Sequence, residues 1–552
     1  MKRLWICLGV VGLIACSVLA WRQFRYTYTE MASYSEIAGK RYERAKTADS
    51  ISIAVVWPQE GADEDNSLWN GARQAQDEIN SRSYPLQDEN GNPFQAGRGR
   101  PYYHKHPVGA YDLEEGRPVC RGIPIRVQTG VVDGNQVWEI RCLKIDLQNI
   151  APRDQAAELD SARRIARDPR FVAVLGHSSN DTAKFAAVSY QQTDLLFFSV
   201  NVTDPSLTNH KFGYVFRMIP NDYEAAKAVV KMVAEFNHCN GIGEERRGRM
   251  GIFYARSAYA MNAVETITAS LGEIDRNLDY VFEKSYDIHL APPLNVVDPG
   301  FLSSLAGLFG GSGRRDSAEL KRQNLREMID EVKNKYPGRG LGPGFDVILL
   351  VDDQSTRAGE ILSLLRSRGV SQPVLAGATL DDEKFFKDSV VKQIYNTLGS
   401  PCPGAATDRP ATPLSCPPAD PADENRPPAS ASGAPPTRDA AQLQNLTLIS
   451  SVFDAAGSAS GVKKFVGKFR EEHRRLPDFI AAQGYEAMMV MAQAFERSES
   501  IAPIDVADTL RSQGPFQGLT EPICFTPDGD IRGKRIYLKV FKNEDSNNHP
   551  DR

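Results

Sequence analysis

Short apolar runs alternate with amphipathic stretches along most of the chain. The clearest case is residues 171–205, where the apolar runs 171–175 and 195–200 are each too short to form a helix. Between them, residues 181–192 place their apolar side chains on one helical face. This pattern predicts a strand, a helix and a strand, with the two strands parallel and buried on both faces.

Both predicted strands end in polar residues. Gly-His-Ser-Ser-Asn follows the first strand at 176–180, and Ser-Val-Asn-Val-Thr ends the second at 199–203. Ligands of open parallel sheets bind just past the carboxyl ends of strands, and the first turn also begins a helix, whose amides favour an anion. We expect the two turns to form half of a small-molecule site. Its candidate residues are Ser178, Ser179, Asn180, Asn201, Val202 and Thr203.

The alternation continues on both sides of this unit and predicts an α/β protein. A strand at 51–57 and a helix at 67–80 come before a β-hairpin of 123–127 and 137–147. A second series of strands and helices begins near residue 250. Because 552 residues are too many for one hydrophobic core, we predict two lobes.

Several segments fall outside this pattern. Residues 27–50 are polar and are interpreted as a tether, 400–444 as a disordered Pro-rich insertion, and 544–552 as a polar tail. Residues 522–541 predict a hairpin around Asp528-Gly529-Asp530. That turn lacks the further ligands of a calcium loop, so we expect a plain turn rather than a metal site.

The N-terminus predicts export. Lys2 and Arg3 precede an apolar run at 4–21, and residues 1–26 have two interpretations. In one, residues 13–16 form a bacterial lipobox and Cys16 is lipidated; in the other, the run stays as a single membrane anchor. Both place the rest of the chain on the extracytoplasmic face of the membrane.

Composition excludes some function classes. The net charge of −5 gives no reason to expect nucleic-acid binding, and no residues have the spacing of a metal or cofactor site. Six cysteines lie beyond the targeting segment, and the sequence does not choose their pairing. Cys120 with Cys142 and Cys402 with Cys416 are the local possibilities.

An enzyme is one alternative. Residues 174–180 are similar to the strand and nucleophile elbow G-x-S-x-G of α/β hydrolases, with Ser178 as the nucleophile. Asn180 stands where the strained turn of that motif needs glycine.

Segments in a shared order carry a family resemblance over about residues 51–543. They include LWNGARQAQDEIN, SARRIARDPRFVAVLGHSSND, LLFFSVNVTDPSLT, YVFRMIPND, FDVILLVDD and FREEHRRLPDFIAAQGYEAMMVMAQAF. The chain resembles the type I periplasmic solute-binding proteins of ABC transporters, in particular the branched-chain amino-acid (leucine/isoleucine/valine) receptors.

The resemblance implies two α/β lobes that close on a ligand. The lobes would comprise 51–219 with 454–515, and 220–453 with 516–543. The function implied is capture of a small amino-acid-like or carboxylate ligand for an ABC transporter permease, without enzyme activity. A ligand-sensing ectodomain that works with a separate signalling partner is the alternative.

The resemblance also assigns roles to residues. In the family a serine and a threonine hold the ligand carboxylate, and these positions match Asn180 and Thr203. The family's Tyr and Glu for the ammonium group have no counterparts here: the loop at 352–355 has no aromatic residue, and the Glu position is Thr379. Either Asp352 or Asp353 can replace that carboxylate. Tyr259 matches a further family tyrosine, and Trp69 is either a wall of the site or a core residue.

Overall fold

The computed structural model describes most of the chain and divides it into two compact units. The residues described are 17, 33–58, 66–85, 111–114, 117–132, 135–225, 248–274, 278–286, 313–336, 346–352, 355–377, 446–455, 457–532, 534 and 536–542. Unit 1 comprises Met1–Val202, Ser206–Ile219 and Ile480–Arg532. Unit 2 comprises Thr203–Pro205, Pro220–Phe479 and Gly533–Arg552.

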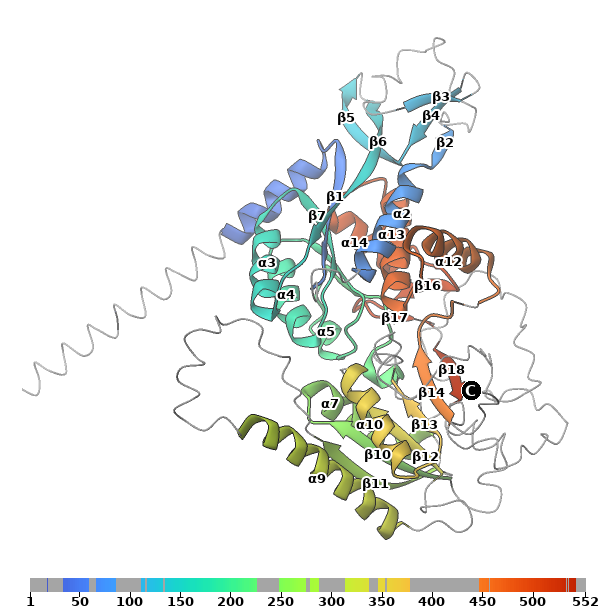
Figure 1. Cartoon of the computed structure of the whole chain (residues 1–552). Coiled ribbons are helices and arrows are strands. Elements are labelled where there is room, and N and C mark those ends of the chain that lie inside the picture. Colours follow the sequence, from blue (N-terminus) through green and yellow to red (C-terminus); the bar gives the residue numbers. More distant parts are fainter. Residues whose placement is uncertain are drawn as a thin grey trace, which may run out of the picture. The chain divides into compact units, whose positions relative to one another are not determined.

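Unit 1 is built on a six-stranded sheet of order β5-β6-β1-β7-β8-β9 (Figure 1). The strands are β1 (Ser50–Val56), β5 (Ile123–Val132), β6 (Asn135–Ile150), β7 (Phe171–Gly176), β8 (Leu196–Ser199) and β9 (Val215–Arg217). All neighbours are parallel except β5 and β6, which form the predicted hairpin. The predicted strand–helix–strand unit is confirmed as β7, α4 (Asn180–Gln192) and β8, with Gly176 paired to Ser199.

Helices cover both faces of this sheet. Apolar residues of α3 (Gln155–Arg167), α4 and α5 (Ser206–Asn209) form one core with inward residues of β1, β7, β8 and β9. On the other face, Phe198 and Phe216 stack with each other and contact Phe525 edge-on. Further helices of the unit are α2 (Ser67–Asn80), α13 (Phe479–Ser498) and α14 (Pro503–Ser512).

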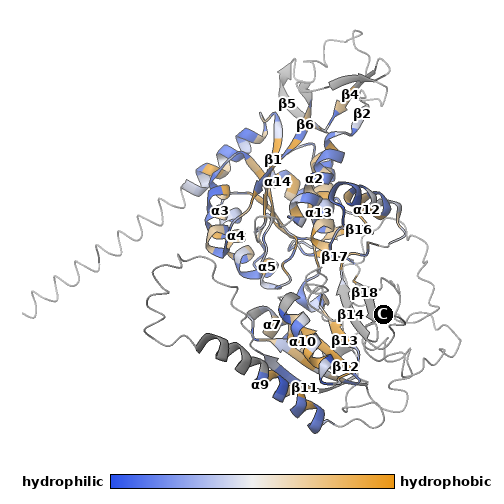
Figure 2. Ribbon diagram, in the orientation of Figure 1, coloured by the Kyte–Doolittle hydropathy of each residue, from blue (hydrophilic) through white to orange (hydrophobic). Residues whose placement is uncertain are grey.

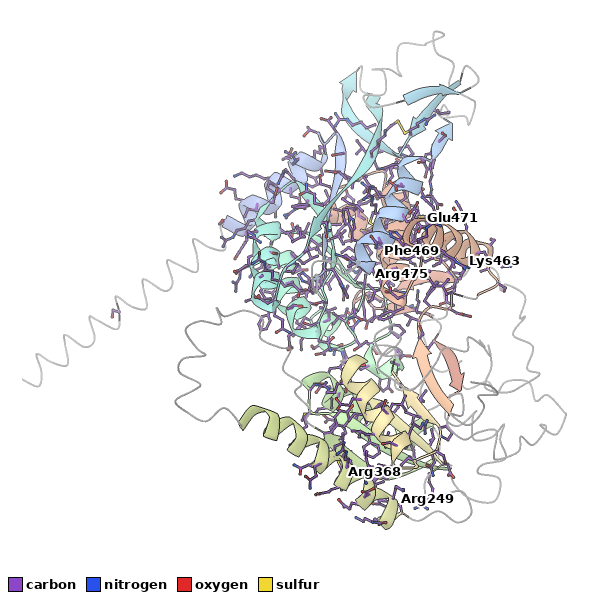
Figure 3. All side chains as sticks on the ribbon, viewed as in Figure 1. Arg249, Arg368, Lys463, Phe469, Glu471 and Arg475 are labelled. Atoms are coloured by element: carbon purple, nitrogen blue, oxygen red, sulfur yellow. A yellow bond between two sulfur atoms is a disulfide. The ribbon has the colours of Figure 1, made fainter. Side chains whose placement is uncertain are left out.

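Two small antiparallel sheets complete unit 1. One has the order β2-β4-β3, from β2 (Ser83–Pro85), β3 (Tyr111–Glu114) and β4 (Arg117–Arg121). The other has the order β15-β16-β17, from β15 (Phe516–Gln517), β16 (Pro522–Phe525) and β17 (Ile531–Arg532). A disulfide joins Cys120 to Cys142, one of the two local pairings considered above (Figure 3).

The expectation of a tether over 27–50 is wrong for the part of it that the structure describes. Residues 33–45 form a helix, and β1 begins at Ser50. Arg41 of this helix is fully buried and donates to the carbonyl oxygens of Phe171 (2.8 Å), Ala166 (2.8 Å), Asp168 (3.0 Å) and Thr193. Four carbonyl partners compensate for the burial of this charge, which would otherwise be costly. A polar helix is thereby fixed to the ends of α3 and α4.

Unit 2 contains a six-stranded sheet of order β11-β10-β12-β13-β14-β18. Its strands are β10 (Gly248–Ala255), β11 (Leu278–Tyr286), β12 (Val347–Val351), β13 (Val374–Ala376), β14 (Leu446–Ser451) and β18 (Tyr537–Lys542). Only the β14–β18 pair is antiparallel within this sheet. The helices described are α7 (Ala258–Ile274), α9 (Gly313–Lys335), α10 (Ser355–Ser367) and α12 (Ser460–His473).

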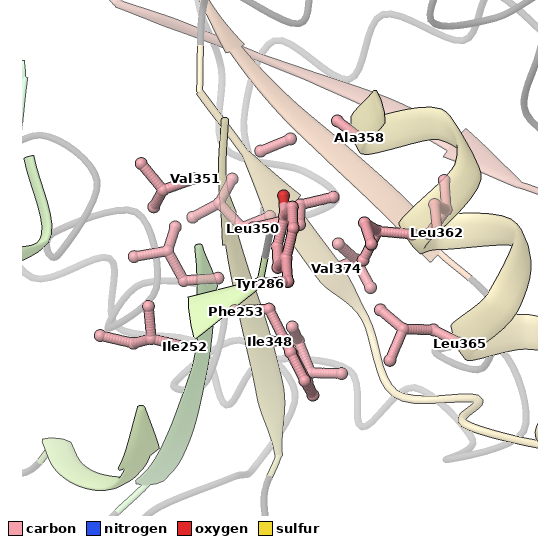
Figure 4. Packing of buried hydrophobic residues seen from close by; sticks show 14 of the residues in the cluster. Ile252, Phe253, Tyr286, Ile348, Leu350, Val351, Ala358, Leu362, Leu365 and Val374 are labelled. Carbon is pink, nitrogen blue, oxygen red and sulfur yellow. The ribbon is translucent and has the colours of Figure 1, made fainter. Parts of the chain in front are cut away.

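The core of unit 2 lies between this sheet and its helices. Ala358, Leu362 and Leu365 of α10 point toward the strands, where they meet residues such as Leu350 and Val374 (Figure 4). Strands β12 and β13 carry mainly hydrophobic residues, whereas α12 is mostly hydrophilic on the side seen in Figure 2. At the end of α12, the Arg475 guanidinium lies 5.2 Å from the centre of the Phe469 ring (Figure 3).

The C-terminal hairpin is shorter than predicted. β16 and β17 pair around the turn at 526–530, whereas β18 pairs with β14 in the sheet of unit 2. The chain passes between units at 479/480 and 532/533, where we expected 453/454 and 515/516. The compact units thus have other boundaries than the lobes implied by the resemblance, and those lobe boundaries stay predictions.

Some expectations concern residues that lie outside the described ranges. They are the targeting segment 1–26 apart from Ser17, the insertion at 400–444 and the tail at 544–552. Within the ranges given above, none of the helices combines the length and apolar character needed to span a bilayer.

Candidate functional site

The order of the strands fixes where each sheet can receive a ligand. In unit 1 the parallel part runs β6-β1-β7-β8-β9, so later strands are added on one side of β1 from β7 onward, while β6 lies on its other side. The switch point is therefore between β1 and β7. Unit 2 repeats this arrangement as β11-β10-β12-β13-β14, with the switch point between β10 and β12. Ligands of such sheets bind at the carboxyl ends of the strands at this switch point. The turn at 176–180 follows β7, and Asp352 follows β12.

In unit 1 the two predicted turns meet. The Asn201 side-chain amide donates to the Ser178 carbonyl oxygen over 3.1 Å. Ser179 caps α4, with its Oγ accepting from the Thr182 amide at 3.3 Å, and Asn180 is the first helical residue. Gly176 has a φ of +152°, and a Cβ there would collide with the Val56 carbonyl oxygen of β1, so only glycine fits this approach. The structure thus brings Ser178 and Asn201 together at the carboxyl ends of β7 and β8.

A buried polar group that the sequence analysis missed supports the first turn. Glu158 of α3 is fully buried and accepts three hydrogen bonds from the turn. They come from His177 Nδ1 (2.8 Å), the Ser178 amide (3.0 Å) and Ser178 Oγ (3.0 Å). His177 Nε2 lies 2.9 Å from the Tyr190 hydroxyl on α4. A glutamate in the first turn of an amphipathic helix gave no sign of this, because its partners lie 19 and 20 positions away.

Burial and hydrogen bonds shift the pKa values of Glu158 and Tyr190 in this group. Burial raises the pKa of Glu158, but the hydrogen bonds from His177 and Ser178 outweigh it, so the pKa lies below the ordinary 4.5. Burial, together with the Glu158 charge, raises the pKa of Tyr190 well above 10, so the phenol keeps its proton. His177 bridges the two residues, with Nδ1 at the Glu158 carboxylate and Nε2 at the Tyr190 hydroxyl. Glu158 is therefore a buried carboxylate held by the turn.

A second buried network holds the other turn. The Arg217 guanidinium is fully buried and donates to the Val202 carbonyl oxygen (3.1 Å), to Thr208 Oγ1 (2.9 Å) and to Asp530 Oδ1 (2.7 Å). Val202 itself is buried, so it offers its backbone rather than its side chain. Asp530 belongs to the turn that we predicted to be plain, and its carboxylate is used in this ion pair. The adjoining Thr203 is grouped with unit 2, where its carbonyl oxygen accepts from the Asp222 amide at 2.8 Å.

In unit 2, Asp352 is already paired. Its carboxylate accepts from Arg357 Nε (2.9 and 3.0 Å) and Nη2 (2.5 Å), and from the Tyr286 hydroxyl (2.7 Å). Both members of the ion pair are buried. The charge of Asp352 is therefore balanced by Arg357 within the protein, whereas we expected it to be available for a ligand ammonium group.

The remaining candidates are less informative. Tyr259 is half-buried and packs against the core of unit 2. Trp69 is half-buried in the first turn of α2, where its amide donates to Asn66 Oδ1, so both interpretations of this side chain stay open. Asp353, Thr379 and Cys16 lie outside the described residues.

The hydrolase alternative requires a base on Ser178, and the structure gives Ser178 a different partner. Its Oγ donates to Glu158, while both ring nitrogens of His177 are engaged by Glu158 and Tyr190. A serine nucleophile is activated by a histidine that accepts its proton. The residues around Ser178 do not have that arrangement.

The chain thus contains two α/β units of the same strand order, each with polar residues past the carboxyl ends of its strands. Two family models match the sequence: one described as "Periplasmic binding protein" over residues 429–538, and one described as "Receptor family ligand binding region" over residues 145–239. No curated protein matches the chain. The chain has the fold of the type I periplasmic binding proteins, and parts of each unit match models of ligand-binding families.

Solved structures share this fold at low sequence identity. An ABC transporter substrate-binding protein from Desulfitobacterium hafniense, in complex with Leu, has a TM-score of 0.53 and 20% identity over 90% of this chain and 98% of that one. A branched-chain amino acid transporter substrate binding protein from Streptococcus pneumoniae, in complex with isoleucine, has 0.52 and 16% over 90% and 97%. A solute binding protein of an ABC transporter from Rhodopseudomonas palustris, in complex with 3,4-dihydroxy benzoic acid, has 0.52 and 11% over 90% and 97%.

Proposed function

We propose that this protein is an extracytoplasmic, non-enzymatic receptor that captures a small carboxylate, either an amino acid or an organic acid, for an ABC importer. The hydrogen bond from Asn201 to Ser178 carries the proposal, because it joins the polar turns after β7 and β8, beside the switch point between β1 and β7. Similar folds hold leucine, isoleucine and 3,4-dihydroxy benzoic acid, according to the names of those structures. All three ligands carry a carboxylate.

Donors at the edge of unit 1 suit a carboxylate. Asn180 offers a side-chain amide, and the hydroxyl of Ser179 and the amides that begin α4 lie beside it. A hydrogen bond to a charged group contributes about 1.5–3 kcal/mol, so three such bonds supply much of the about 8 kcal/mol of micromolar binding. In our proposal Thr203 adds a donor from the second turn, and Tyr259 and Trp69 contact the ligand beside its carboxylate.

The ion pair of Asp352 with Arg357 weakens the case for a ligand with an ammonium group. A buried ammonium needs a negative partner, and the charge of Asp352 is balanced by Arg357. We therefore rank acids without an ammonium group, such as aromatic carboxylates, beside amino acids. Asp353 and Thr379 stay candidates for an ammonium group in the proposal.

Attachment to the membrane is part of the same proposal. The apolar run at 4–21, kept as an anchor or replaced by a lipid on Cys16, would hold the receptor at the cell surface. The docked helix at 33–45 would then be the first described part of unit 1 after this attachment.

A thermal-shift screen tests the function. We expect one member of a panel of amino acids, their amides, and aliphatic and aromatic acids to raise the melting temperature by several degrees. A ligand at 100 times its Kd adds about 2.7 kcal/mol. Thr203→Ala should weaken the shift, whereas Ser512→Ala, an exposed position on α14, should leave it unchanged. A response to amides but not to acids, or to no compound in the panel, would contradict the proposal.

A further inference from the structure

We propose that Glu158 is a positioning residue that sets the first turn and withdraws Ser178 from direct contact with the ligand. The inference rests on the proposed function and deepens it. It divides the candidate residues after β7 into a support, Ser178, and two that face the ligand, Ser179 and Asn180.

Both hydrogen-bond donors of Ser178 are used by Glu158. Ser178 has two groups that could bind an anion, its amide and its hydroxyl, and both donate to Glu158 at 3.0 Å. Each group has one hydrogen to donate. While Glu158 holds both, Ser178 cannot donate to a ligand carboxylate.

The Glu158 carboxylate, which accepts these hydrogen bonds, is itself held in place. Glu158 begins the buried face of α3, and its carboxylate lies near the positive end of that helix. His177 fixes the carboxylate from one side, and Tyr190 fixes His177 from the other. Tyr190 and His177 also contact Phe197 of β8 through their rings. The turn is therefore tied to α3, α4 and β8 at once.

Other residues of the turn remain for a ligand. The side chain of Ser178 is directed to α3, and its carbonyl oxygen accepts from Asn201. Ser178, Ser179 and Asn180 are all half-buried, but the Ser179 and Asn180 side chains are not used by Glu158; Ser179 Oγ instead lies 2.9 Å from Thr182 Oγ1 at the start of α4. Glu158 thus orients the donors at 179–180 and at the same time places a fixed negative charge behind them.

Hydrogen exchange of the ligand-free protein tests the inference directly. Glu158→Leu removes the acceptor of the Ser178 amide, so amides in peptides covering 176–181 should exchange about tenfold faster or more. Glu486→Leu is the matched control, since Glu486 is an equally buried carboxylate of unit 1 that accepts from the Leu519 amide at 2.8 Å. It should speed exchange near 519 and leave 176–181 unchanged. Unchanged exchange at 176–181 in Glu158→Leu would overturn the inference.

Glu158→Gln covers the possibility that the leucine variant does not fold. Glutamine keeps an acceptor oxygen for Ser178 but loses the charge, so we expect an increase in exchange at 176–181 of a few-fold. Protection equal to that of the unchanged protein would show that the carboxylate does not hold the turn.

A double-mutant cycle then separates support from contact, with the panel acid that gives the largest thermal shift as the probe. If Ser178 acts only through Glu158, then Ser178→Ala and Glu158→Leu are coupled, and the double variant binds no more weakly than Glu158→Leu alone. If Ser178 touches the ligand, the two losses in affinity multiply and the inference fails. A panel without any binder would count against the proposed function, whereas the exchange experiment would still decide the role of Glu158.

Discussion

Three buried charges decide much of the structure at the scale of single residues. Arg41, Glu158 and Arg217 are each almost inaccessible to solvent, and each makes several hydrogen bonds. Burial lowers the pKa of Arg41 to about 10, which still leaves it charged at neutral pH. Burying a charge is costly unless it is compensated, so these sites mark places where the chain is held in one arrangement.

The lowered pKa of Glu158 predicts a specific loss of stability in acid. Its pKa in the folded protein lies below the ordinary 4.5, so its contribution is complete above about pH 4.5 and is lost as the pH falls through the folded value. Glu158→Gln should lower the free energy of unfolding by about 1.5–3 kcal/mol at pH 7. This deficit should shrink as the pH approaches 3.5. Urea unfolding at four pH values between 7 and 3.5 measures it.

The same helix offers the control for this prediction. Asp160 is two positions away on α3, but it is exposed and pairs only with the exposed Arg163. Exposed pairs contribute little, so Asp160→Asn should change the unfolding free energy by less than about 0.5 kcal/mol at every pH. A deficit of Glu158→Gln that stays constant down to pH 3.5 would contradict the pKa assigned to Glu158.

At the scale of elements, apolar periodicity predicted what is buried against a parallel sheet. The predicted ends of three elements agree with the structure to within one residue. These are the strands at 171–175 and 195–200 and the helix at 181–192, observed as β7, β8 and α4. β7 and β8 bury all of their apolar residues, whereas α4 buries one apolar face and leaves Phe185 and Val188 exposed, so the pattern records which face packs on the sheet.

Elements held by long-range polar contacts could not be predicted in this way. The helix at 33–45 has Arg41 at its most buried position, and the nearest of its carbonyl partners is 125 residues away. The helix α9 is polar over most of its length, so its weak apolar stripe did not stand out. For the same reason the candidate site was predicted as two turns, whereas Glu158 behind the first of them was not.

Close packing of α2 on α13 provides a test at the element scale. A Cβ on Gly71 would collide with the backbone carbonyl of Ala481, so the two helices approach through the missing side chain. Gly71→Ala should destabilise the protein by about 1–3 kcal/mol, because backbone must shift to relieve the overlap. The urea unfolding midpoint measures the effect.

Gly39 is the matched control, because it also lies in a helix but has nothing within 4 Å of the place of a Cβ. Alanine has the higher helix propensity, so Gly39→Ala should leave the stability unchanged or raise it by up to about 1 kcal/mol. A Gly71→Ala variant as stable as Gly39→Ala would show that α2 and α13 are not in contact in solution.

At the scale of the whole molecule, each unit is assembled from distant parts of the chain. Unit 1 takes its sheet from the N-terminal part and takes α13, α14 and the small sheet β15-β16-β17 from the C-terminal part. Arg217 and Asp530 join these parts, as do the rings of Phe216 and Phe525. Among the described residues after 532, unit 2 takes the strand β18.

A truncation after residue 479 should therefore damage the two units unequally. It removes α13 and α14 from unit 1, together with the partner of Arg217, which leaves a buried charge uncompensated. Unit 2 loses one edge strand, and its central strand β12 keeps both neighbours. Hydrogen exchange measured by mass spectrometry should show β1 and β7 losing protection while β12 keeps most of it. A chain that ends at Lys542 retains every helix and strand given above, so it should be protected like the 552-residue chain. Persisting protection of β1 and β7 in the shorter chain would mean that unit 1 folds without its C-terminal part.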